Sequence, residues 1–191
     1  MTDETLWRKT GQGAGLIPYI FIDGQAYIFL GRRKTVDSFG KLSLPAGFSD
    51  LHLADGSHPE WVETSMSDDC LIHHPIDTAI RETEEETDVK VDKDRVESLI
   101  WSATLYHIPS DQYFTTTLFP YMVIIDEITT MQLADTDEMH KWEGYNEQEI
   151  HLLVAKNQLA YAHEYEAIKL LFERFRKQRR HSDNLKKFYD D

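Results

Sequence analysis

Cysteine is almost absent from this chain, because Cys70 is the only one among 191 residues. A single cysteine cannot build an internal disulfide framework or a zinc site made of several cysteines, and its ordinary role is that of a small hydrophobic side chain. Long apolar runs are also missing: no stretch approaches about 18 uncharged apolar residues, and the first ten residues, MTDETLWRKT, lack the apolar core of a signal peptide. These absences predict a cytoplasmic protein that does not span a membrane.

Positive charge is scarce, since 20 Lys and Arg residues face 34 Asp and Glu residues and leave a formal net charge of −14. Duplex nucleic acid needs a basic face, so it is not an expected partner. Basic residues are concentrated near the C-terminus, in FERFRKQRRHSDNLKKFYDD. This segment is open to two interpretations: contact with a phosphate-rich ligand or acidic partner, or a solvated helix end whose cations suit the negative pole of the helix dipole. The second is the simpler one.

The content of 41% hydrophobic and 28% charged residues is that of one soluble globular domain over residues 1–191. Apolar patterns and turn residues predict a hairpin over 15–33, an extended segment over 41–48, a helix over 75–89 and a second hairpin over 96–125. A final helix over 157–180 is expected to pack on the sheet. The stretch GQGAG before the first hairpin suggests a flexible lead-in. Residues 51–70 are polar and turn-rich and predict an insertion of little regular structure, and residues 181–191 predict a mobile tail.

The stretch RETEEET, residues 81–87, places Glu82, Glu85 and Glu86 on one flank of the predicted helix and Glu84 on the other side. Like charges at such spacings repel by roughly 0.2–0.5 kcal/mol per pair. Carboxylates are the ligands that Mg²⁺ prefers, so a bound cation would offset the repulsion. The alternative is a solvated, glutamate-rich surface helix in an unrelated α+β protein, and the cluster by itself does not decide between them.

The order of motifs is more specific than the cluster. A hairpin ending in GRR, then LPAGF, then RETEEETDV resembles the Nudix hydrolase family, whose box reads G-x5-E-x7-R-E-U-x-E-E-x-G-U with U apolar. Arg81, Glu82, Glu85, Glu86 and Val89 match the box in register, and Gly47 takes the place of the leading glycine. The resemblance implies an α/β fold, an α/β/α sandwich with a mixed sheet and a C-terminal helix.

Three departures from the box accompany the resemblance. Gly47 lies thirty-four positions before Arg81, so an insertion separates the two parts of the box. His73 stands where the box has its first glutamate, whose role would be lost or taken over by Glu60 or Glu63 of the insertion. Asp88 replaces the glycine that closes the helix, and aspartate tolerates the left-handed conformation better than most residues.

The resemblance also implies roles. Glu82, Glu85 and Glu86 would bind Mg²⁺ or Mn²⁺, helped by the backbone carbonyl of Ala46, while Arg81 would hold a glutamate in place. Water would attack a phosphorus of a diphosphate. The general base in this family is either a box glutamate, here Glu85, or an acid on a later loop. In this chain that loop is DTDEMHKWEG, where Asp137 and Glu138 are the candidates.

The implied activity is hydrolysis of a diphosphate linkage in a nucleoside diphosphate derivative, such as ADP-ribose or a nucleotide sugar. The alternative is a non-catalytic module of the same fold that binds a nucleotide. Independently of that choice, the insertion, with Trp61 as a contact, is interpreted as a lid or specificity loop over the substrate. Many proteins of this fold pair up, so a homodimer is one expected arrangement. Other residues have less specific interpretations: core or nucleobase stacking for Tyr106, Tyr113, Phe114 and Trp142, and ordinary surface or capping roles for His74, His107, His140, His151 and His163.

Overall fold

The computed structural model describes residues 12–49, 51–53, 70–72, 74–107 and 112–189. The chain enters the fold as the predicted hairpin, formed by strands β1 (Gln12–Ile22) and β2 (Gln25–Arg33). Asp23 and Gly24 turn it with φ angles of 51° and 74°, the positive values that a tight hairpin turn requires. The predicted flexible lead-in is wrong, because β1 already begins at Gln12 and pairs on both sides there.

Seven strands form the main sheet, in the order β3-β2-β1-β8-β7, with β4 also paired to β1 and β9 to β2. Strands β1 and β8 run parallel and their neighbours antiparallel, so the sheet is mixed, as predicted. Strands β7 and β8 are the predicted second hairpin. The remaining strands of this sheet are β3 (Leu42–Ser43), β4 (Ala46–Phe48), β7 (Trp101–His107), β8 (Gln112–Met122) and β9 (Met139–Tyr145).

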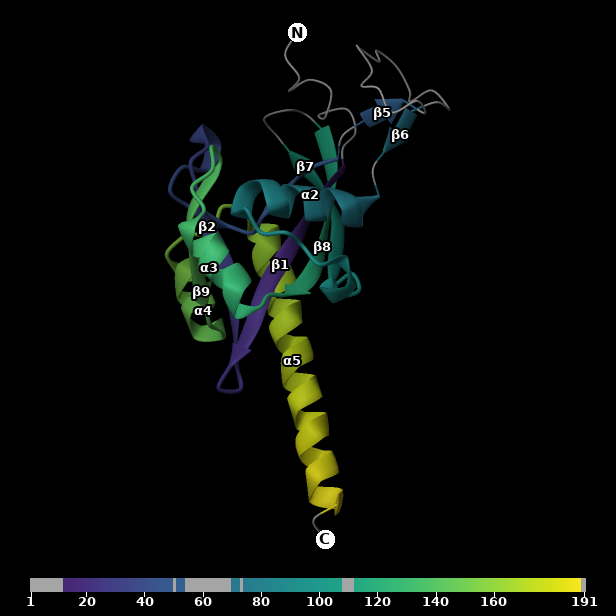
Figure 1. Cartoon of the computed structure of the whole chain (residues 1–191), viewed down its shortest axis with the longest axis vertical. Coiled ribbons are helices and arrows are strands. Elements are labelled where there is room, and N and C mark those ends of the chain that lie inside the picture. Colours follow the sequence, from purple (N-terminus) through teal and green to yellow (C-terminus); the bar gives the residue numbers. More distant parts are fainter. Residues whose placement is uncertain (1–11, 50, 54–69, 73, 108–111, 190–191) are drawn as a thin grey trace.

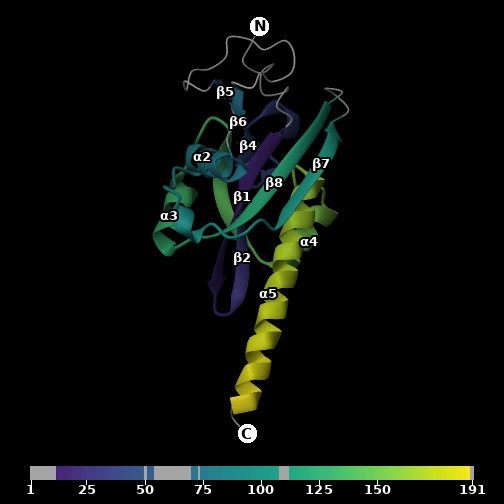
Figure 2. The same ribbon diagram turned by 90° about the vertical axis from the view of Figure 1, so that its right-hand side faces the viewer.

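Alternating side chains of the central strands build a core on each face of the sheet. Leu16 and Phe119 belong to one core, whereas their neighbours Ile17 and Leu118 belong to the other. Helices α2 and α3 cover the first face and α4 and α5 the second, which Figures 1 and 2 show from two sides. The helices are α2 (Pro75–Thr87), α3 (Ile125–Leu133), α4 (Glu147–Ala155) and α5 (Ala162–Tyr189), with short 3-10 turns at Val36–Ser38 and Lys93–Arg95. This is the predicted three-layer α/β/α sandwich.

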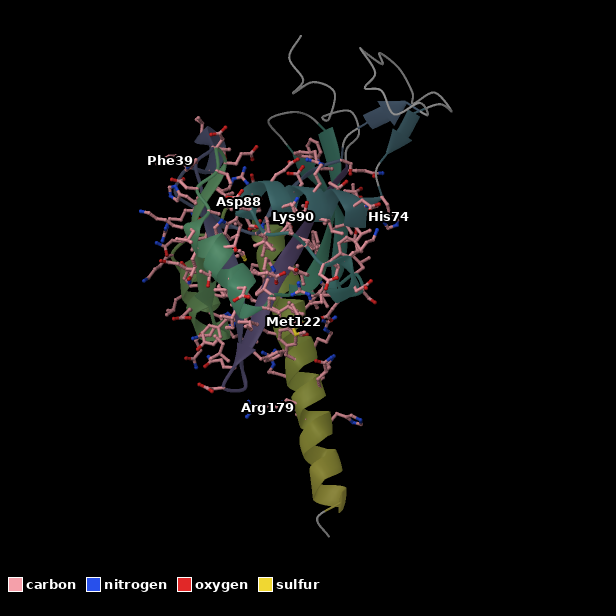
Figure 3. All side chains as sticks on the ribbon, viewed as in Figure 1. Phe39, His74, Asp88, Lys90, Met122 and Arg179 are labelled. Atoms are coloured by element: carbon pink, nitrogen blue, oxygen red, sulfur yellow. The ribbon has the colours of Figure 1, made fainter. Side chains whose placement is uncertain are left out.

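Helix α5 is the predicted C-terminal helix, but it begins at Ala162 rather than before Leu159. Leu159 instead bridges to Leu42 at the edge of the sheet. The helix continues through residue 189 and extends well beyond the sheet (Figure 1), so residues 181–189 are helical. Arg179 lies on this extension (Figure 3). The mobility predicted for residues 181–191 stays a prediction.

The predicted insertion has more regular structure than its sequence indicates. Strands β5 (Leu51–Leu53) and β6 (Cys70–Ile72) pair antiparallel as a separate two-stranded sheet. Residues 54–69 lie outside the described part of the chain. Among the described helices, none combines the length and apolar character needed to cross a membrane.

Candidate active site

Helix α2 carries the glutamates, and its two ends are fixed by local chemistry. His74 caps the start by accepting a hydrogen bond from the Ile76 amide (3.4 Å), and Pro75 takes the first helical position. Asp88 ends the helix in the left-handed conformation, with φ 58°. Figure 3 marks these ends at His74 and Asp88. The helix therefore starts and stops where the sequence predicts.

The buried side of α2 is partly polar. Ala79 and Thr83 are buried, whereas Ile76 and Ile80 are only half-buried. Thr83 donates its hydroxyl hydrogen bond to the Ala79 carbonyl (2.7 Å). Glu84 points away from the other glutamates and accepts a hydrogen bond from the Val91 amide (3.0 Å), which confirms that it does not belong with them.

Glu86 is the most deeply placed of the helix glutamates, with 3% of its surface exposed. Its Oε2 accepts a hydrogen bond from the Ala46 amide (3.1 Å). Its Oε1 is buried and has no hydrogen-bond partner among the described residues. Burial raises the pKa of Glu86 well above its ordinary value, and the negative charge of Glu82 adds to that rise, while the Arg33 charge opposes it. A cation bound next to Glu86 would therefore stabilise its ionised form.

Glu82 lies against the backbone of β4, so closely that a methyl group added at Gly47 would overlap its carboxylate. Burial raises the pKa of Glu82 to about 7, although the Arg81 guanidinium works in the opposite direction. Arg81 donates hydrogen bonds to Glu82 (2.6 Å), to Glu85 (2.8 Å) and to the Phe48 carbonyl (2.9 Å). The arginine thus links two glutamates to the strand.

Glu138 joins the helix glutamates from a distant part of the chain. It directly precedes β9, and its backbone carbonyl accepts a hydrogen bond from the Lys34 amide (2.7 Å) after the end of β2. The negative charge of Glu138 raises the pKa of both Glu82 and Glu86. We call Glu82, Glu85, Glu86 and Glu138 the acid cluster. For Asp137, the other candidate base, a role stays a prediction.

Sequence reasoning missed Arg33, whose positive charge acts on Glu86. Its side chain is 9% exposed, and its Nε donates a hydrogen bond to the Thr35 hydroxyl (3.1 Å). The guanidinium lies over the Tyr161 ring at 5.4 Å, and that ring stacks on His163. Such a contact holds a partly desolvated cation in place. The motif GRR predicted no role for it, because arginine at a strand end is common.

Sequence reasoning also missed Glu164, which is 2% exposed at the start of α5. Its Oε1 accepts hydrogen bonds from the Ser43 hydroxyl (2.6 Å) and the Leu44 amide (3.1 Å). Burial raises its pKa to about 8, against the effect of those hydrogen bonds and of the Arg33 charge. Its position was readable, because Glu164 precedes Ala167, Ile168 and Leu171 by three, four and seven residues and so shares their buried stripe.

The acid cluster suits a hard divalent cation. Its donors are carboxylates, the buried Glu86 Oε1 is unpartnered, and Gly47 leaves the space that Glu82 fills. As the side chains stand, the described residues contain no ready-made group of three acidic, His or Cys ligands. Arg81 accounts for this, since it draws Glu82 and Glu85 to itself and supplies their counter-charge. The chemistry of these carboxylates fits the ion, but Glu82 and Glu85 would have to bind it while they also accept hydrogen bonds from Arg81, or in place of doing so.

Other predicted residues have varied outcomes. Trp142 and Phe114 are buried, 1% and 9% exposed, which confirms their role in the core. Ala46 contacts Glu86 through its amide, and a role of its carbonyl stays a prediction. Cys70 lies in β6. Several predictions concern residues or side chains that the structure does not describe. They are the predictions on His73, Glu60, Glu63 and Trp61, and on the side chains of Tyr106, Tyr113 and His107.

Several solved structures share this fold at low sequence identity. Shewanella oneidensis NrtR complexed with a 27mer DNA is 13% identical over 88% of this chain and 63% of its own, with a TM-score of 0.58. A NUDIX hydrolase from Nitrosomonas europaea is 16% identical over 85% of this chain and 88% of its own, with a TM-score of 0.54. A binary complex of the C. elegans Ap4A hydrolase is 18% identical over 87% and 98%, with a TM-score of 0.51.

The NUDIX domain of NrtR is also known in complex with ADP ribose, and matches with a TM-score of 0.53 at 12% identity over 85% of this chain and 86% of that one. The chain spans 43% of a MutT/nudix family protein from Enterococcus faecalis and 64% of the NrtR chain, less than two thirds of each. No protein-family model matches the sequence, and no curated protein matches it. The likeness is one of fold, and the fold is that of the Nudix proteins.

Proposed function

We propose that this protein is a divalent-metal-dependent hydrolase that cleaves the diphosphate linkage of a nucleoside diphosphate joined to a second moiety, such as ADP-ribose or a nucleotide sugar. The buried Glu86 carboxylate carries the proposal, because one of its oxygens has no hydrogen-bond partner among the described residues and the negative charges of Glu82 and Glu138 act on it. Two neighbours in fold support the substrate class: one was solved with ADP ribose, and the other is named an Ap4A hydrolase.

Glu82, Glu85 and Glu86 would bind Mg²⁺ or Mn²⁺ together with the Ala46 carbonyl. Such an ion polarises a phosphoryl group and lowers the pKa of an attacking water. Arg81 positions Glu82 and Glu85 through its two hydrogen bonds and need not touch substrate. Glu138 is exposed, and its negative charge acts on Glu82 and Glu86, so it is the residue we propose to accept the proton of the water, with Glu85 as the other candidate base.

The test is turnover with a panel of ADP-ribose, nucleotide sugars, dinucleotides and nucleoside triphosphates in the presence of Mg²⁺, with products identified by mass. Glu86→Gln and Glu85→Gln should each lose at least about 100-fold in kcat, since each removes a metal ligand. Glu84→Gln is the matched control, because it makes the same chemical change on the same helix but outside the cluster. Equal activity in all three variants would contradict the proposal.

The alternative of a binding module keeps one specific observation in its favour. His73 occupies the position of the first box glutamate, so one acid of the resembling motif is missing. A binding module would show a ligand-dependent rise in Tm with no product on the same panel. Metal-dependent product formation would exclude it.

A further inference from the structure

Glu164 places a buried carboxyl group against a short stretch of the chain. Both of its hydrogen bonds go to one segment, Ser43–Gly47, which links β3 to β4. Its second oxygen is buried without a hydrogen-bond partner among the described residues. A glutamine oxygen could accept the same two hydrogen bonds, so the contact requires an acceptor at this position.

The Ser43–Gly47 segment is also what holds the acid cluster. The Ala46 amide donates to Glu86 (3.1 Å), and the Gly47 backbone receives the Glu82 carboxylate. Between the two ends, the Pro45 carbonyl accepts a hydrogen bond from the Leu16 amide (3.2 Å). Glu164 on α5 and Glu86 on α2 therefore grip the same few residues from helices that cover opposite faces of the sheet.

Arg33 connects the two carboxylates electrostatically. Its charge favours the ionised form of both Glu86 and Glu164, and its position is fixed by Thr35 and the Tyr161 ring.

We propose that Glu164 is a positioning residue for the acid cluster: it fixes the Ser43–Gly47 segment, and with it the amide that holds Glu86 and the surface that receives Glu82. The metal-binding part of this inference rests on the proposed function. Residues that orient the ligands of a metal typically change its affinity about 10- to 100-fold when they are removed. Glu164 touches neither the ion nor the substrate in this scheme.

Three variants of the full chain test the proposal. Glu164→Ala removes the acceptor and the charge, and Glu164→Gln keeps an acceptor of the same shape. Leu171→Ala creates a cavity under the same helix, since Leu171 is fully buried, but it removes no hydrogen bond to the segment and matches the general loss of stability. Two quantities are measured: Mn²⁺ affinity, from the electron paramagnetic resonance signal of free Mn²⁺, and metal-free hydrogen exchange of the Ala46 amide by NMR.

We expect Glu164→Ala to weaken Mn²⁺ binding about 10-fold or more and to accelerate exchange of the Ala46 amide. Glu164→Gln should recover most of both losses. Leu171→Ala should lower Tm yet keep the Mn²⁺ affinity of the wild type. Equal changes in Glu164→Ala and Leu171→Ala would overturn the inference, because both would then report only helix packing.

The two proposals fail separately. A wild-type protein that binds no Mn²⁺ overturns the proposed function, and the exchange of the Ala46 amide then still decides whether Glu164 positions the segment. Faster exchange in Glu164→Ala but not in Leu171→Ala upholds the positioning role, and the same rate in both removes it.

Discussion

Gly47 and Glu82 are in closer contact than any side chain at position 47 would allow. The glycine of LPAG is therefore required for space, and its partner across that space is a carboxylate of the acid cluster. Predicting this contact from the sequence alone requires the resemblance to a known motif, because the two residues lie thirty-five positions apart. Their approach depends on how β4 and α2 pack.

Gly47→Ala should displace the Glu82 carboxylate and weaken Mn²⁺ binding by about 10-fold or more, the range found when a ligand loses its support. The measurement is a titration followed by electron paramagnetic resonance. Gly24→Asn serves as the control, because a side chain at the hairpin turn would meet no atom within 4 Å and asparagine tolerates the positive φ there. Unchanged affinity in Gly47→Ala would mean that Glu82 does not bind the metal.

The burial of Glu164 could not be predicted from the residue type alone. A lone glutamate in a helix with other acids, Glu166 and Glu173, looks like part of its polar face. Its burial is decided by the third layer of the fold, where β3 ends under α5. The stripe of apolar neighbours was a usable signal, but it predicts only a position on the buried side and no partner.

Among the elements, α2 was predictable because several signals agree. Pro75 marks its start, Asp88 its end, and the box sequence lies between them. Helices α3 and α4 were missed because each has only nine residues, which is too short for a clear apolar repeat. The start of α4 did carry a signature, since Asn146 and Glu149 cap each other's amides (3.1 and 2.8 Å).

Asp88 is an imperfect end for α2 in two respects. It adopts φ 58°, which costs an aspartate more than a glycine, and its negative charge faces the negative pole of the helix dipole. Asp88→Gly should therefore raise the free energy of unfolding by about 0.5–1 kcal/mol, measured by urea denaturation.

Asp88→Asn separates the two causes, because it removes the charge and retains a residue that tolerates this conformation. A gain from both variants would assign the effect to charge, and a gain from glycine alone would assign it to the backbone. A loss of stability in Asp88→Gly would show that the aspartate side chain contributes to folding in a way that its position does not suggest.

At the scale of the whole molecule, the buried carboxylates make stability depend on pH. The pKa of Glu82 is raised from 4.5 to about 7 and that of Glu164 to about 8. The folded state therefore retains protons that the unfolded state has released. The stability that these groups contribute is complete below their ordinary pKa and is lost as pH rises through the raised values.

His163 acts in the opposite sense, because burial lowers its pKa from 6.5 to about 4. Its contribution is present above its ordinary pKa and is lost as pH falls towards the lowered one. Between pH 6.5 and 8.5 its effect is nearly constant, so the carboxylates dominate there. We expect the metal-free protein to lose about 2 kcal/mol of unfolding free energy over this range, measured by denaturation at each pH.

Glu164→Gln should reduce the dependence of the unfolding free energy on pH, since it removes one of the two carboxyl groups whose raised pKa lies between 6.5 and 8.5. Mn²⁺ should also flatten it, because a bound cation favours the ionised glutamates and adds stability at the upper pH. A metal-free protein that gains stability from pH 6.5 to 8.5 would contradict the assignment of raised pKa values to these groups.

The fold also dictates when the candidate site can come into being. Strand β1 pairs in parallel with β8, which the ribosome makes about a hundred residues later, so β1 leaves the ribosome without a neighbour on that side. Glu138 follows β8, and Glu164 comes after both. The helix glutamates are therefore synthesised long before the residues that hold and complete their cluster, and a growing chain cannot form the complete candidate site until α5 has emerged and docked.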